Sequence, residues 1–249
     1  MFWLLACQAP TPAPARLESL LGFLFERVPD DDTTELDDGA AKLADWMSER
    51  VEETSEGYAI DTLTPDQIAS TELDQDNEDL VGVSLGFEHA GTTQDYVEAL
   101  LVPPTERRDN FTSYTREVTA GSEACFTDGS CDYLATETWS TKELGLGVVE
   151  TSHMRLQYRR LDTANGPGVI YRAWAAEPPE WTTDLLAIEQ SYFLWGFVPD
   201  AGGTVRSMQA GWVEATILAA DLDYDVVLQL WINGMVSSAE DMEAWAIGG

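Results

Sequence analysis

Apolar residues near the start of the chain recur every three or four positions, which is the spacing of an amphipathic helix. Two such stretches, residues 16–28 and 35–56, are separated by the helix-breaking run Pro-Asp-Asp-Asp. Their apolar positions are Leu17, Leu20, Leu21, Leu24 and Phe25, then Leu36, Ala40, Leu43, Met47 and Val51. Gly57 suits the end of the second helix, and Thr64-Pro65-Asp66 suits the start of another. We therefore expect residues 16–79 to form an acidic accessory helical segment.

The spacing changes at residue 80, where apolar and β-branched runs alternate with turn residues. Residues 80–88 are typical of a strand, and residues 94–101 of a helix with a threonine cap and two prolines after it. Further strands are expected at residues 111–118, 131–142, 148–161, 169–175, 187–198 and 204–218. This succession of strand and turn predicts an antiparallel meander.

The end of the chain fits two structures. Residues 226–232 followed by Asn233-Gly234 are typical of a strand that enters a tight hairpin. A long helix through Trp245 is the alternative we favour, because five apolar residues then share one helical face. They are Val227, Trp231, Met235, Met242 and Trp245. Strand or helix over residues 226–236 decides the fold.

With the helix, the body of the chain resembles a known superfamily. Residues 192–199, Tyr-Phe-Leu-Trp-Gly-Phe-Val-Pro, are followed by Gly-Gly-Thr-Val-Arg at 202–206. These resemble the strand, proline-led turn and next strand start that precede the last strand in START-like (Bet v 1-like, helix-grip) proteins. The resemblance extends over about residues 80–245. It implies an α+β fold in which a curved antiparallel sheet wraps around a long C-terminal helix and encloses an apolar cavity, within a domain of residues 80–249. A hairpin at the end would imply a different β-rich fold.

The first residues resemble a bacterial lipoprotein signal. Leu4-Leu5-Ala6-Cys7 is similar to a lipobox, in which the cysteine is lipidated and becomes the mature N-terminus. The segment lacks a positive n-region and its apolar stretch is short, so an incidental cysteine is the alternative. Residues 8–15 alternate proline with small residues, as an extended tether does. Residues 1–15 are thus expected to be a signal remnant and tether. The chain would be anchored by lipid in the cell envelope, facing the periplasm or the exterior.

The remaining cysteines, Cys125 and Cys131, flank a turn-rich loop with Asp-Gly at its centre. A disulfide across such a loop fits an oxidising compartment. A metal site is the alternative, but two thiols need further ligands, and the only histidines are His89 and His153. We favour the disulfide, and we expect His89 to lie in a surface loop.

Charge and motifs exclude several functions. The 249 residues carry a net charge of -32, which repels nucleic acid. No phosphate loop, dinucleotide fingerprint or nucleophile elbow is present, so we expect no cofactor and no enzyme, with a carboxylate-based hydrolase as a remaining alternative. The acidic runs at residues 74–79 and 221–225 lack the glycine and terminal glutamate of an EF-hand, and we interpret them as solvated loops rather than metal sites.

A cationic row is the most informative polar pattern. His153, Arg155, Gln157 and Arg159 alternate onto one face of their strand, and Arg172 follows in the next strand. The row is a candidate site for an anionic head group. Pairing with glutamates across strands, such as Glu137 or Glu189, is the alternative that we favour.

Aromatic residues are concentrated in the predicted strands and the last helix, where they belong either to a core or, by the resemblance, to a cavity wall. The candidate ligand-binding residues are Tyr158, Tyr171, Arg155, Arg159, Arg172, Phe193, Trp195, Trp212 and Trp231. The leading hypothesis is a monomeric, membrane-anchored lipoprotein whose domain binds an apolar or amphipathic, lipid-like ligand. The alternative is an interaction lipoprotein with a solid core and no small-molecule ligand.

Overall fold

A large antiparallel sheet organises the protein. The computed structural model describes residues 11–144, 147–183, 186–217 and 224–248. The strands of the sheet follow the order β1-β2-β9-β8-β6-β5-β4-β3, and β7 pairs with β5 at the side. Their bounds are β1 (Tyr58–Ile60), β2 (Val81–His89), β3 (Phe111–Ala120), β4 (Tyr133–Glu143), β5 (Val149–Thr163), β6 (Gly166–Ala175), β7 (Glu180–Trp181), β8 (Leu186–Pro199) and β9 (Val205–Ile217). The antiparallel meander is confirmed.

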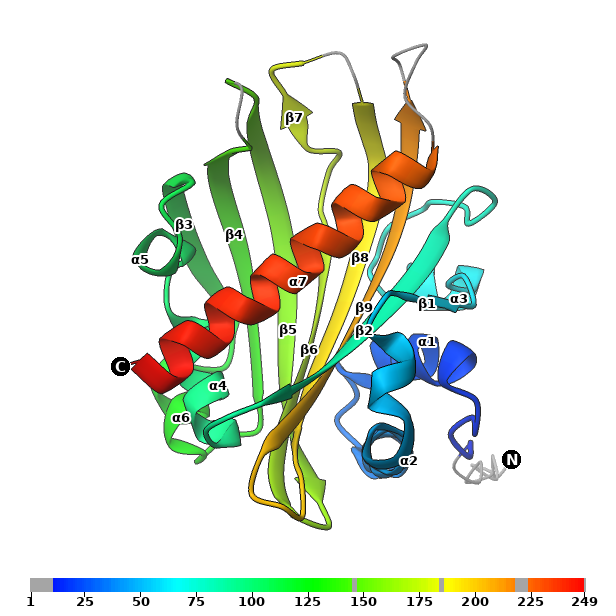
Figure 1. The fold of residues 1–249 in the computed structure, drawn as a ribbon, viewed down its shortest axis with the longest axis vertical. Coiled ribbons are helices and arrows are strands. Elements are labelled where there is room, and N and C mark those ends of the chain that lie inside the picture. Colours follow the sequence, from blue (N-terminus) through cyan, green and yellow to red (C-terminus); the bar gives the residue numbers. More distant parts are fainter. Residues whose placement is uncertain (1–10, 145–146, 184–185, 218–223, 249) are drawn as a thin grey trace, which may run out of the picture.

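Helices precede, interrupt and follow the strands. They are α1 (Leu17–Arg27), α2 (Thr34–Arg50), the 3₁₀ helix η1 (Val51–Thr54), α3 (Pro65–Ala69), α4 (Thr93–Leu101), α5 (Pro104–Arg107), α6 (Glu123–Asp128) and α7 (Tyr224–Gly248). The long C-terminal helix is confirmed and the hairpin is excluded. Helix α7 crosses the curved sheet diagonally (Figure 1). The fold is therefore the predicted α+β arrangement of a sheet on its C-terminal helix. In the described part of the chain, no helix is both long and apolar enough to cross a membrane.

Different helices cover the two faces of the sheet. On β9, Trp212 packs edge-on against Phe25 of α1, with ring centroids 5.7 Å apart. A Cβ on the preceding residue, Gly211, would instead lie 2.5 Å from Trp231 of α7. Because neighbouring residues of a strand point to opposite faces, α1 and α7 lie on opposite sides. We call the α7 side the inner face and the α1 side the outer face.

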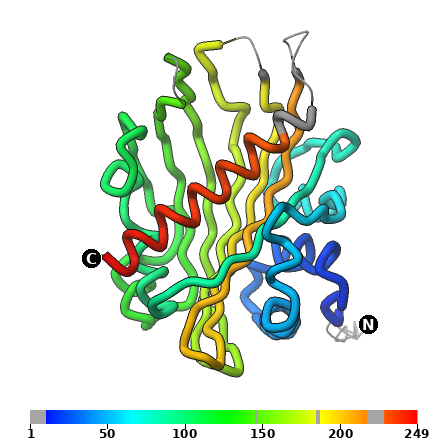
Figure 2. Tube along the Cα trace, viewed as in Figure 1, coloured from blue at the N-terminus to red at the C-terminus, as the bar shows by residue number. Residues whose placement is uncertain are grey.

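The N-terminal segment is part of the main core. Its leucines share one buried cluster with outer-face residues such as Ile170, Tyr192 and Trp212. Strand β1 also pairs with β2, at Ala59 and Val83 among others. In Figure 2 the N-terminal part and the end of α7 lie at opposite sides of the molecule. Residues 16–79 thus form helices as expected, but they also supply a strand and the cover of the outer face.

Two local expectations are corrected. The segment between Cys125 and Cys131 begins inside the short helix α6 and is not simply a loop. The helix ends at Asp128 and is followed by Gly129 in the left-handed conformation. The two cysteines are joined by the expected disulfide. His89 is not a surface-loop residue. It ends β2, is 3% exposed, and its Nε2 lies 2.7 Å from the Ser207 hydroxyl. Burial lowers its pKa, so the neutral ring is favoured.

Candidate functional site

The residues predicted to bind ligand are divided between the two faces. Tyr158, Tyr171, Phe193, Trp195 and Trp231 lie on the inner side, whereas Arg155, Arg159, Arg172 and Trp212 lie on the outer side. Tyr158 and Arg159 are neighbours in β5, as are Tyr171 and Arg172 in β6. The nine residues therefore do not form one site.

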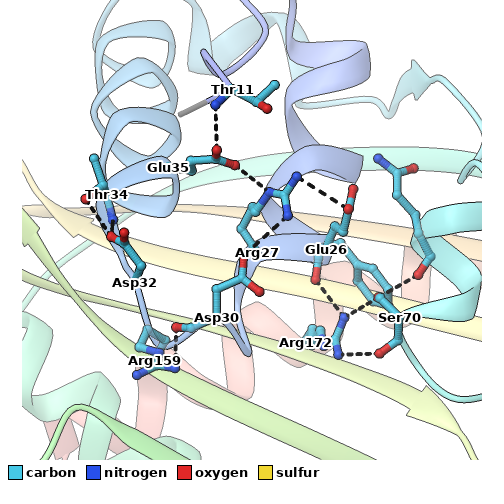
Figure 3. A network of polar contacts seen from close by, with 12 residues as sticks. Thr11, Glu26, Arg27, Asp30, Asp32, Thr34, Glu35, Ser70, Arg159 and Arg172 are labelled. Carbon is cyan, nitrogen blue, oxygen red and sulfur yellow. Dashed lines mark hydrogen bonds and ion pairs between the residues drawn. The ribbon is translucent and has the colours of Figure 1, made fainter. Parts of the chain in front are cut away.

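Two outer arginines hold the N-terminal segment. The Arg172 guanidinium donates to both oxygens of Ser70, at 2.7 and 2.9 Å (Figure 3). It also donates to the Phe25 carbonyl at 3.0 Å and to Gln157 Oε1 at 2.7 Å. Burial lowers the pKa of Arg172 to about 10, so it stays charged at neutral pH. Arg159 donates to the carbonyls of Val28 and Asp30 at 3.2 and 2.8 Å. Backbone carbonyls of the N-terminal segment thus accept hydrogen bonds from both guanidinium groups, and Arg159 Nη1 also lies 3.2 Å from Asp132 Oδ2.

Two residues of the cationic row, His153 and Arg155, pair with a glutamate of the neighbouring strand β4. Arg155 Nε lies 3.0 Å from Glu137 Oε1, and His153 Nε2 lies 3.2 Å from Glu137 Oε2. The His153 ring also stacks on Trp139, with centroids 4.6 Å apart. The favoured alternative, pairing with Glu137, is therefore confirmed.

Two clefts lie on the outer side. One of about 360 Å³ lies between the N-terminal segment and β3–β6, with Glu72, Glu137, Arg155 and Arg172 in its wall. The other, of about 330 Å³, is lined by Asp74, Asp76, Gln190 and acidic residues of β8 and β9. The walls of both clefts are mainly polar, and the two arginines of the first cleft already have partners. Neither cleft suits an apolar ligand.

Aromatic rings form a continuous chain on the inner face. Tyr158 contacts Tyr171 at a centroid distance of 5.4 Å, and Tyr171 contacts Trp195 at 6.2 Å. Trp195 in turn lies 4.8 Å from Phe197. The rings belong to strands β5, β6 and β8, which are adjacent in the sheet. The register of antiparallel pairing thus gathers residues that are far apart in the sequence.

Part of this inner face remains open to solvent. Tyr158 and Trp195 are buried at 2% and 4% exposure, but their neighbours are only partly buried. These partly buried inner residues are Met154, Leu156, Tyr171, Phe193 and Trp231. Phe193 and Trp231 stack across the sheet–helix boundary, with centroids 5.0 Å apart. We call these five residues the inner apolar surface.

Polar groups without partners border the inner apolar surface. The indole Nε1 of Trp195 is buried and has no hydrogen-bond acceptor among the described residues. The same holds for Nε of Arg107, the last residue of α5. The pKa of Tyr171 is raised to about 12 because burial outweighs the opposing effect of the nearby Arg107 and Arg108. A buried donor without an acceptor is unfavourable, so these groups would gain from a ligand oxygen.

Sequence reasoning missed Arg107, Met154 and Leu156. Helix α5 is a single turn after Pro103 and has too few residues for a periodic pattern. Only the Arg107-Arg108 pair, in a chain with 13 basic residues, could have drawn attention to it. Met154 and Leu156 alternate with the cationic row and so fall on the opposite face of the strand, but nothing in the sequence distinguishes a partly open wall from a filled core.

Some predicted features lie outside the reach of the structure. Cys7 is outside the described residues, as are residues 221–223 of the second acidic run. Within the described chain, no group of three or more histidine, cysteine or acidic residues is arranged to hold a metal ion.

Comparisons with known proteins give a fold likeness only. No protein-family model matches the sequence, and no curated protein sequence matches it. The structure is similar to a START-superfamily protein from Mycobacterium smegmatis, at 10% identity and a TM-score of 0.42, covering 67% of this chain and 97% of that one. TTHA0849 from Thermus thermophilus aligns at 14% identity and 0.46, with the same coverage. The di-domain ARO/CYC BexL aligns at 12% identity and 0.46, covering 85% of this chain and 61% of that one. At these identities and TM-scores, the likeness supports no conclusion about ligand or activity.

Proposed function

We propose that the protein binds an apolar or amphipathic small molecule on its inner face, as a binding protein rather than an enzyme. The observation that carries this proposal is the inner apolar surface itself. Its aromatic and methionine side chains stay partly exposed on a sheet whose opposite face is covered by the N-terminal segment. Methionine and aromatic side chains adapt to apolar ligands of varied shape. A ligand lying there would remove this apolar area from water, a change that favours binding.

The test replaces one residue of the surface and one matched residue elsewhere. Leu156→Glu places a charge among the inner aromatic rings, whereas Leu144→Glu changes a leucine that is 45% exposed. Dodecanol, which is neutral, serves as the probe in titration calorimetry on the full chain. We expect binding by the wild type and Leu144→Glu, and a loss of at least about tenfold in affinity for Leu156→Glu, because a charge facing apolar atoms must be desolvated.

Native mass spectrometry of the purified protein gives an independent readout. We expect a co-purifying mass of lipid size that organic extraction removes. A clean protein mass together with no dodecanol binding would contradict the proposal and favour an interaction module with a solid core.

We further propose that Cys7 is lipidated and that residues 8–15 tether the domain to a membrane of the cell envelope. The lipobox-like sequence motivates this, and the Cys125–Cys131 disulfide is compatible with an exported protein. Detergent phase partitioning after bacterial expression tests it. We expect the wild type in the detergent phase and Cys7→Ala in the aqueous phase; equal partitioning of both would refute the anchor.

A further inference from the structure

Arg107 differs from every other basic side chain of the protein. Ten of the 13 arginine and lysine residues form ion pairs with carboxylates. Arg160 and Arg172 donate instead to backbone carbonyls. Arg107 has neither kind of partner among the described residues, and its one hydrogen-bond acceptor is the Met242 thioether, 3.7 Å from Nη1. A thioether is a weak acceptor and carries no charge.

The missing partner is notable because acids are abundant. The chain has 45 acidic residues against 13 basic ones. The acid on α7 next to this site, Asp241, is engaged by Arg108, whose Nε lies 2.7 Å from Asp241 Oδ2. An unpaired cation that is partly removed from water is unfavourable unless something else supplies the opposite charge.

Arg107 borders the inner apolar surface. It contacts α7 through Met242, which packs in the same cluster as Trp195 and Tyr171. Burial is the main cause that lowers its pKa, and Arg108 adds to the lowering, while Tyr171, Asp241 and Tyr114 oppose it. The groups around the guanidinium are therefore a second cation, one engaged carboxylate and two tyrosines. The local field favours an anion.

We propose that Arg107 binds the carboxylate of an amphipathic ligand whose apolar chain lies on the inner apolar surface. This inference rests on the proposed function, and it assigns the ligand class as a long-chain carboxylic acid. A guanidinium matches the two oxygens of a carboxylate in geometry and charge. One unpaired cation neutralises one negative charge, so a carboxylate fits better than a phosphate dianion. The net charge of the chain repels anions at a distance, but physiological salt screens this over about 8 Å.

Calorimetry with three probes of equal chain length tests the proposal on the full chain. The probes are dodecanoate, dodecanol and dodecylamine, which carry a negative, neutral and positive head. The wild type should bind dodecanoate most tightly and dodecylamine least. Arg107→Met should weaken dodecanoate binding about 10- to 100-fold, the range for a lost charge-assisted hydrogen bond, and leave dodecanol binding unchanged. Arg155→Met, on the outer face, is the matched control and should bind all three as the wild type does.

The outcomes separate this inference from the function on which it rests. Dodecanoate and dodecanol binding with equal affinity to the wild type would overturn the role of Arg107 and leave inner-face binding standing. Binding of neither probe would overturn both. The wild-type order of the three probes decides the matter even if Arg107→Met does not fold. Dodecyl phosphate, added as a fourth probe, should bind more weakly than dodecanoate; tighter binding would contradict the carboxylate assignment.

Discussion

Two buried arginines fix the N-terminal segment to the sheet through carbonyl oxygens rather than through acids. Arg172 is 1% exposed and reaches both Phe25 and Ser70, which are far from it in the sequence. Its removal would take the donor away from the buried contact at the Phe25 carbonyl and from the partly buried contact at the Ser70 carbonyl. We therefore expect the removal of Arg172 to lower the free energy of unfolding by more than the removal of any surface ion pair in the chain.

Arg172→Met tests this role. We expect the free energy of unfolding in urea to fall by about 2–4 kcal/mol, because a buried and a partly buried acceptor lose their donor. Arg155→Met removes an arginine that is 35% exposed and should change stability by less than about 1 kcal/mol. Equal stability of the two variants would show that Arg172 does not hold the segment.

The alternation of side chains along a strand predicts which residues share a face of the sheet. The period of two in β5 correctly places Arg155 and Arg159 on one face and Tyr158 on the other. It cannot show which face is covered, because the cover of the outer face comes from residues more than a hundred positions earlier. The sequence could therefore not show that backbone carbonyls of the N-terminal segment lie against Arg159 and Arg172.

Helix α7 is seated on the sheet by a close approach of one ring to one glycine. Gly211 of β9 leaves room for Trp231, whose Nε1 would be 2.5 Å from an added Cβ. The Trp231 ring is also held by its stack on Phe193. A rigid ring fixed on two sides cannot easily move away, so the fit at Gly211 controls how α7 docks.

Gly211→Ala tests the docking. We expect a loss of about 1–3 kcal/mol in unfolding free energy, the usual effect of overpacking, and a change in Trp231 fluorescence. Gly234 on α7 is exposed, and an added methyl group would meet no atom within 4 Å, so Gly234→Ala should stabilise by about 0.5–1 kcal/mol. Combining Gly211→Ala with Trp231→Phe should recover part of the loss. If the double variant recovered no stability, the destabilisation by Gly211→Ala would not come from the contact with Trp231.

Length decided which elements could be predicted. The long strands and helices carry enough apolar positions to show their period, and α7 is one of them. Helices α5 and α6 have four and six residues, and β7 has two, so no period exists to detect. Arg107, on which the proposed ligand class depends, lies on one of these short elements.

At the scale of the whole molecule, the two faces of the sheet are closed to different degrees. The outer face is closed by residues 16–79, and the inner face is partly closed by α7. In Figure 1, α1 and α2 lie to one side of α7, near β1 and β2. The N-terminal segment therefore closes the outer face, and the proposed ligand would lie on the inner face.

Removing residues 1–79 tests this division. The remaining chain would expose outer-face side chains such as Ile170, Tyr192 and Trp212, which are buried at or near 0% exposure. We expect the truncated chain to bind the dye ANS and to lose cooperative unfolding in urea, because it lacks a large part of its main core. A stable, cooperatively folded fragment would show that residues 80–249 are an independent domain.

The most direct test of inner-face binding is NMR on protein labelled at its methionine methyl groups, with dodecanoate added. Met154 and Met242 lie on the inner side, whereas Met47 and Met208 are buried in the outer core. Inner-face binding predicts nuclear Overhauser effects from the ligand chain to Met154 and Met242 and none to Met47 or Met208. Contacts confined to Met47 and Met208, or no contacts at saturating ligand, would contradict it.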